Sequence, residues 1–252
     1  MNPRLGKEIS KMKSSKLATI FVTFIAVSGL AMLGGSVLKL HGLHPYQFLT
    51  LLIVSAAASR MKVKLPGVDG TMSVNLPFML IAAAQLSLFE ALVVALVSAG
   101  VQCIPKSGGT LQPVKMLFSV STIVLAAGAA AILLHNHWLT GSTHRISALP
   151  LLAACSSFFL INTLPVATII SLTEGSHLLR IWSSICHLSF PYYLACTGVT
   201  SIVTTMSQFV GWQVPLAILP VMLLMYRCYR LYFGHATEAH AVVGVRATAA
   251  GH

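Results

Sequence analysis

The chain has 252 residues, of which 56% are hydrophobic and only 8% are charged, and its mean hydropathy is +0.83. Soluble domains carry about 25% charged residues, so this composition excludes a soluble globular protein and indicates a bundle of membrane helices. The net charge of +11 also fits no nucleic-acid binding protein, because the basic residues gather at the ends of apolar segments and not on one aromatic-rich face.

The first segment, residues 1–16, is basic and is predicted to be a cytoplasmic N-terminus. The apolar stretch 17–38 that follows is too long for the core of a signal peptide, and no small-residue cleavage pattern ends it. We therefore predict a retained first span. A shorter apolar stretch, 46–59, comes next and stops at Arg60, where a basic loop rich in turn residues begins.

The apolar stretch 73–104 is too long for one ordinary span and slightly short for two. We divide it near Ser87 into two short helices, 73–86 and 88–104. The division places nearly all lysines and arginines on the cytoplasmic side, whereas a single helix would reverse the rest of the chain and remove that bias. The basic residues left outside are Lys39 and Arg145.

Four further spans are predicted, at 113–134, 148–172, 180–207 and 214–233. The prolines inside them are tolerated in a membrane, because neighbouring helices satisfy the freed carbonyl groups. Residues 234–252 lack helical periodicity and are predicted to form a disordered cytoplasmic tail. The expected fold is all-α: a polytopic transmembrane bundle at 17–233 with about eight spans, two of them short, and both termini in the cytoplasm.

Polar side chains inside the apolar segments are the candidate ligand-binding residues, because hydrocarbon penalises such groups unless they find partners. They are Asn75, Gln85, Glu90, Gln102 and His187. Two interpretations of Glu90 stay open. It lies either at the headgroup level, or inside the bundle, where a loop cation such as Lys39 or Arg145 would pair with it or it would serve as a proton or cation site.

The second half of the stretch 73–104 carries small residues on one helical face. They are Ala91, Ala95, Ser98 and Ala99, with Gln102 on the same face. Small residues let helix backbones approach closely. The face is therefore either a packing seam or the wall of a ligand cavity.

No sequence motif for catalysis is present, neither a nucleophile elbow nor a Walker A or HExxH motif, so we predict that the chain is not an enzyme. Haem is not expected, because His187 has no second histidine well inside a predicted span to complete the ligand pair. The loop histidines His135, His137 and His144 lack an acidic or cysteine companion, so no metal site is predicted. The five cysteines form no CxxC pair and are typical of buried small hydrophobic residues. No cofactor is predicted.

Several phrases together resemble a known family. They are Leu65-Pro66-Gly67-x-x-Gly70-Thr71-x-Ser73-x-Asn75, Leu86-Ser87-Leu88-x-Glu90-Ala91, Val101-Gln102-Cys103, Met116-Leu117-Phe118 and Tyr226-x-x-Tyr229-Arg230-x-Tyr232. This pattern resembles the N-terminal membrane region of bacterial signalling proteins, in which a polytopic sensor module precedes a GGDEF domain that makes cyclic di-GMP or an HD-type phosphohydrolase domain. The layout is also similar to the substrate-binding membrane subunits of vitamin transporters.

The resemblance implies a multi-pass protein of the bacterial inner membrane that binds a small molecule, as a sensor or a transporter subunit. In the signalling proteins a catalytic domain follows the last helix, whereas here residues 234–252 follow it, so we expect a partner protein to supply output or energy. The proposed cavity would be lined by Asn75, Gln85, Gln102 and His187. The alternative is a structural or scaffold subunit of a larger membrane complex, in which small-residue faces pack against other chains.

Overall fold

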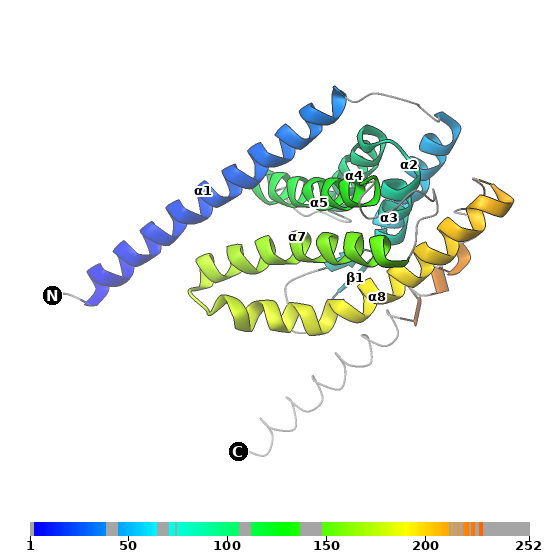
Figure 1. Ribbon diagram of the computed structural model, residues 1–252. Coiled ribbons are helices and arrows are strands. Elements are labelled where there is room, and N and C mark those ends of the chain that lie inside the picture. Colours follow the sequence, from blue (N-terminus) through cyan, green and yellow to red (C-terminus); the bar gives the residue numbers. More distant parts are fainter. Residues whose placement is uncertain are drawn as a thin grey trace, which may run out of the picture.

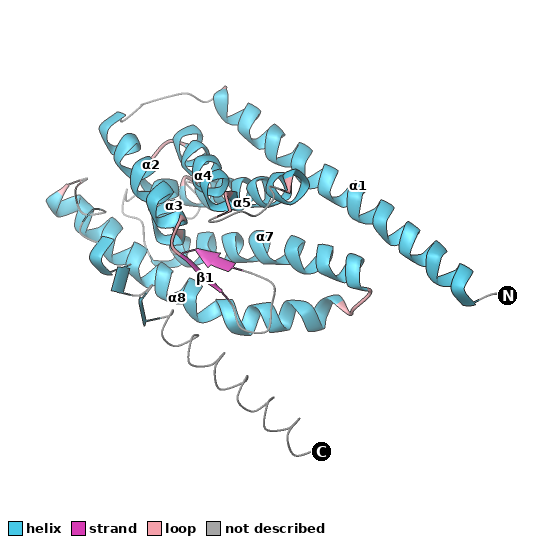
Figure 2. Ribbon diagram, turned by 180° about the vertical axis from the view of Figure 1, so that it is seen from behind, coloured by secondary structure: helices cyan, strands magenta, loops and turns pink. Residues whose placement is uncertain are grey.

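The computed structural model describes residues 3–38, 45–64, 71–73, 75–105, 112–136 and 148–211, and single positions between 213 and 228. Within these ranges the chain is helical except for one short hairpin (Figure 1, Figure 2). The hairpin pairs β1 (Lys62–Lys64) with β2 (Thr71–Ser73) in antiparallel register. This part of the chain confirms the all-α expectation.

Three of the described helices are long and apolar enough to cross a membrane. They are α1 (Pro3–Val37), α5 (Pro113–Leu134) and α7 (Ala148–Glu174). Helix α8 (Leu178–Val210) packs antiparallel to α7. The shorter apolar helices are α2 (Pro45–Ser59), α3 (Leu76–Gln85) and α4 (Leu88–Cys103).

Among the described helices, α1 and α8 extend furthest beyond their predicted limits. α1 begins at Pro3 and so includes most of the basic segment, because lysine is a good helix former and does not end a helix. α8 continues to Val210 and ends at Gly211, whose φ of 103° suits a residue without a Cβ. The last predicted span, 214–233, and the predicted tail, 234–252, lie largely or wholly outside the described residues.

The division of the stretch 73–104 into two short helices is confirmed by α3 and α4, which meet at Leu86 and Ser87. Phe78, near the start of α3, packs in one buried apolar group with Val94 of α4 and Val54 of α2. The first turn of α2 is bonded to the last residue of α3 through Gln47 and Gln85, and α4 follows α3 after two residues and packs against it, so α3 runs antiparallel to both neighbours. The chain therefore reverses direction at the turn between α3 and α4.

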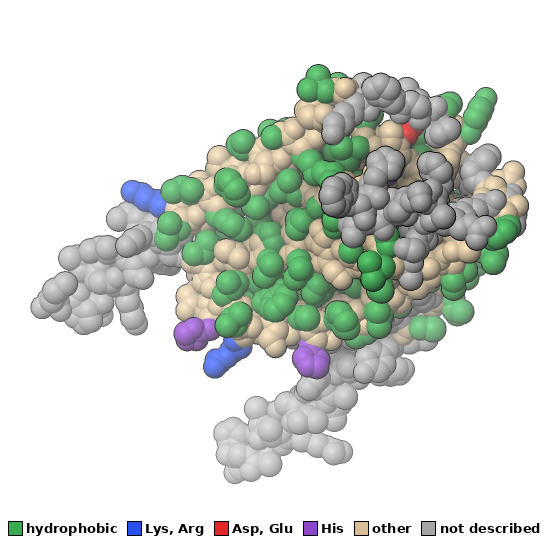
Figure 3. Space-filling view, viewed as in Figure 1, with side chains coloured by type: hydrophobic (Ala, Val, Ile, Leu, Met, Phe, Trp, Pro, Cys, Tyr) green, Lys and Arg blue, Asp and Glu red, His purple; other side chains and the backbone are tan. Residues whose placement is uncertain are grey.

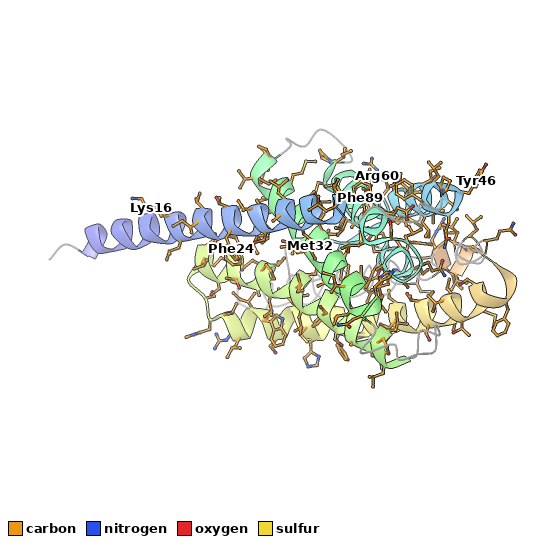
Figure 4. The ribbon with its side chains drawn as sticks, turned by 45° about the horizontal axis from the view of Figure 1, so that its top comes forward. Lys16, Phe24, Met32, Tyr46, Arg60 and Phe89 are labelled. Carbon is orange, nitrogen blue, oxygen red and sulfur yellow. The ribbon has the colours of Figure 1, made fainter. Side chains whose placement is uncertain are left out.

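α1 and α5 run in the same direction. Midway along α1 and near the beginning of α5 the rings of Phe21 and Phe118 lie 6.3 Å apart. Further along both helices Met32, which is labelled in Figure 4, contacts Gly128. Between these points Gly29 faces Ser121 so closely that a Cβ at Gly29 would lie 3.0 Å from the Ser121 Cβ. The absence of a side chain at Gly29 is what permits this close crossing.

α3 is the most deeply buried helix that the structure describes. Phe78, Leu80, Ile81 and Ala82 are each 0% exposed. With 1.5 Å of rise per residue, its 10 residues extend over only about 15 Å, half the thickness of the hydrocarbon core. Helices α2, α4, α5 and α8 pack around it. α3 is therefore an interior helix of the bundle.

The outer surface of the bundle is also apolar. Hydrophobic side chains spread over the face made by α1, α7 and α8 (Figure 3). Ile20, Phe24, Leu149 and Leu179 on these helices are all at least 65% exposed. Large exposed apolar side chains over a wide area are expected of a surface in contact with lipid tails.

Candidate functional site

One polar group of residues joins three helices at the end of α3. The amide Nε2 of Gln47 donates to Oε1 of Gln85 at 2.8 Å, and Nε2 of Gln85 donates to the hydroxyl of Ser207 at 2.7 Å. These three residues, called the Gln85 cluster below, come from the first turn of α2, the last residue of α3 and the last turn of α8. Gln85 therefore uses both halves of its amide to link α2 and α8.

The positions of these residues follow from the helix boundaries. α3 ends where the backbone N–H of Leu86 bonds to the carbonyl of Ala82, which brings Gln85 to the rim of the buried helix. The hydroxyl of Ser207 also donates to the carbonyl of Thr204 at 3.0 Å. Each group of the cluster is half-buried, so its hydrogen bonds must come largely from protein.

Glu90 lies beside this cluster, on the first turn of α4, and is 2% exposed. One of its carboxylate oxygens accepts hydrogen bonds from the hydroxyl of Ser87 at 2.8 Å and from the Ser87 backbone N–H at 3.1 Å. The Glu90 N–H donates in return to the Ser87 hydroxyl at 3.4 Å. Ser87 and Glu90 form a capping box that satisfies the free N–H groups at the start of α4.

The capping box was a missed signal in the sequence. A serine followed three residues later by glutamate, just before an apolar run, is typical of a helix start. Glu90 thus has a structural role that the two interpretations from sequence did not include. The cations considered for it, Lys39 and Arg145, lie outside the described residues.

The remaining candidate residues lie elsewhere. Asn75 is buried at the opposite end of α3, and Gln102 is half-buried at the far end of α4. His187 is exposed on α8. The structure therefore brings Gln85 and Glu90 to the two sides of one turn, and it does not bring Asn75, Gln102 or His187 to them.

The small-residue face of α4 is a packing seam. Ala91, Ala95 and Ala99 are at most 3% exposed, and the hydroxyl of Ser98 lies 2.7 Å from that of Ser55 on α2. Helices α2 and α5 cover this face within the chain. Close approach of backbones explains why these positions are small.

A second set of polar contacts, between α7 and α8, was not predicted from the sequence. The amide of Asn162 donates to the hydroxyl of Tyr193 at 2.9 Å, and the indole N–H of Trp182 donates to Thr163 at 3.2 Å. The ring of Phe159 stands edge-on to that of Tyr193 at 4.9 Å between centroids. The neighbouring tyrosines at 192 and 193 were the available signal, since buried phenols need hydrogen-bond partners.

An apolar bundle whose interior polar side chains bond either across helix contacts or to carbonyl groups of their own helices belongs to the class of multi-pass membrane proteins. A comparison with family models matches residues 14–232 to MASE9, and the chain belongs to this family of membrane-associated sensor domains, which are found N-terminal to signalling output domains. Membership of this family confirms the resemblance to the membrane sensor region of signalling proteins that the sequence motifs indicated. The MASE sensor domain itself is non-catalytic. No curated protein and no solved structure matches the chain.

Proposed function

We propose that this sensor domain responds to a small polar molecule at the Gln85 cluster and passes the response through α8 to an output domain or partner protein. The observation that carries the proposal is the double hydrogen bond of Gln85 to Gln47 and Ser207. A molecule with one donor and one acceptor could replace either bond at little net cost, because one hydrogen bond is exchanged for another. Such an exchange would free α2 from α3, or α3 from α8.

The proposed site faces the outside of a bacterial plasma membrane. Because α1 and α5 run in the same direction, an odd number of crossings must separate them. The antiparallel pair α3 and α4 returns the chain to the side from which it came, and α2 supplies the remaining crossing. This count supports an arrangement of about eight segments with both ends in the cytoplasm, where basic residues concentrate.

The topology predicts which face of the membrane reaches the turn between α3 and α4. A single cysteine placed at Phe89 in a background without other cysteines (Figure 4) is expected to react with a membrane-impermeant maleimide added to whole cells. A cysteine at Lys16 should react only after the cells are opened. Labelling of position 89 from the cytoplasmic side alone would contradict the outward-facing site.

Mass spectrometry of the protein tests the ligand. Native spectra of the chain released from nanodiscs made in cell lipids are expected to show a bound small molecule, and the Gln85→Leu variant should lose it. Gln102→Leu is the matched control, because it removes the same amide at the far end of α4. A spectrum without any added mass, or equal retention in both variants, would contradict the proposed site.

The scaffold alternative has less support. It requires small-residue faces that lack a partner within the chain. The small faces of α4 and α5 are buried instead, with Ala95, Ala126 and Ala130 each 0% exposed. The packing surface of α4 and α5 is therefore used inside this chain, and the exposed small residues that the structure describes on α1, Ala31, Gly34 and Gly35, are the ones that another subunit could contact.

A further inference from the structure

The beginning of α3 is buried, which creates a hydrogen-bonding problem. Asn75 and Leu76 are each 4% exposed, and Phe78 is 0% exposed. The first N–H groups of a helix have no partner within the helix, and in an apolar interior the protein must supply one. Pro77 removes one of these donors because it has no N–H. The side chain of Asn75, at the N-cap position, does not cap the helix.

The missing acceptor comes from α8. The Tyr192 hydroxyl is hydrogen-bonded to the Leu76 backbone, and it is also hydrogen-bonded to the thiol of Cys196 one turn further along α8. Leu76 is the first residue of α3, so its carbonyl is used within the helix and its N–H is the free group. The phenol oxygen accepts from this N–H, and the Tyr192 O–H donates to the sulfur. Tyr192 is 4% exposed, so the whole arrangement is shielded from water and lipid.

The other end of α3 is also bonded to α8, through Gln85 and Ser207 at 2.7 Å. We propose that Tyr192 is a positioning residue: it holds the beginning of α3 against α8, so that α3 and α8 shift as one unit and Gln85 keeps its place in the cluster. The proposal deepens the proposed function, since it names a second contact, besides the bond of Gln85 to Ser207, through which a shift of α3 reaches α8. The hydrogen bonds themselves do not depend on any ligand.

A double-mutant cycle tests this coupling without a ligand. Tyr192→Phe removes only the hydroxyl, and Gln85→Leu removes the bond at the opposite end of α3. Distant sites without shared partners change the unfolding equilibrium constant independently, to within roughly two-fold. If α8 holds α3 at both ends, loosening one end reduces the effect of loosening the other. The unfolding equilibrium constant of the double variant should then be at least about five-fold lower than the value obtained by multiplying the two single effects.

Tyr193→Phe, combined with Gln85→Leu, is the matched control. Tyr193 is also a buried tyrosine with a hydrogen-bonded hydroxyl, but its bond goes to Asn162 on α7 and not to α3. The effects of Tyr193→Phe and Gln85→Leu on the unfolding equilibrium constant should therefore be independent, so that the double variant shows their product. Independent effects in the Tyr192 cycle, or equal coupling in both cycles, would overturn the proposal. Since no ligand enters the measurement, its failure is distinct from a failure of the mass-spectrometric test of the site.

Discussion

Replacing Gln85 with leucine is expected to lower the free energy of unfolding of the protein in bicelles by about 1–3 kcal/mol. The substitution removes two hydrogen bonds and leaves the amide of Gln47 without its acceptor in a half-buried position. Ser207 keeps its bond to the carbonyl of Thr204, so most of the loss should come from the α2 side. Unfolding measured by steric trapping or by detergent titration gives the value.

Gln102→Leu is the comparison that makes this result specific. Gln102 is half-buried on α4, and its side chain makes no hydrogen bond within the described part of the chain. Its replacement should change the free energy of unfolding by less than about 0.5 kcal/mol. An equal loss in the two variants would mean that the stability depends on helix polarity in general and not on the links made by Gln85.

A valine at Gly29 is expected to destabilise the protein by about 1–3 kcal/mol, as over-packing of a tight contact does. The added Cβ would lie 3.0 Å from the Cβ of Ser121 and 3.2 Å from its Cα, and a backbone atom cannot turn aside as a side chain can. α1 must then move away from α5. Thermal unfolding in nanodiscs measures the loss, and a spin-label distance between the two helices measures the separation.

Gly34→Val provides the control on the same helix. A Cβ at Gly34 meets no atom within 4 Å, so the new side chain projects into open space. Both variants carry the same helix-propensity change from glycine to valine, and only Gly29 has the steric conflict. A similar loss of stability in both would show that the tight crossing with Ser121 is not the cause.

The turn between α3 and α4 could be predicted from the sequence because two independent quantities agreed on it. The stretch 73–104 has the wrong length for a single span, and the sidedness of the lysines and arginines requires a reversal near Ser87. Helix length and charge distribution are properties of the chain itself. Both can therefore be read from the sequence without knowing how the helices pack.

The rotation of each helix about its axis could not be predicted. Lipid and protein interior are both apolar, so a membrane helix lacks the polar stripe that marks the outer face of a soluble one. His187 and Tyr192 are five positions apart on α8, yet the first is exposed and the second is buried against α3. For the same reason Asn75, Gln102 and His187 seemed to line one cavity with Gln85.

The close crossing of Gly29 and Ser121 distinguishes the contact of α1 with α5 from the contacts that Gln85 makes with α2 and α8. The Cβ, Cα and hydroxyl oxygen of Ser121 would all lie within 3.3 Å of a Cβ added at Gly29, so a small molecule has no room to enter between these two helices. The hydrogen bonds of α3 to α2 and α8 can be replaced by hydrogen bonds to a small polar molecule. We therefore expect a stimulus that acts at Gln85 to shift α2, α3 and α8 and to leave the closely packed α1 and α5 in place.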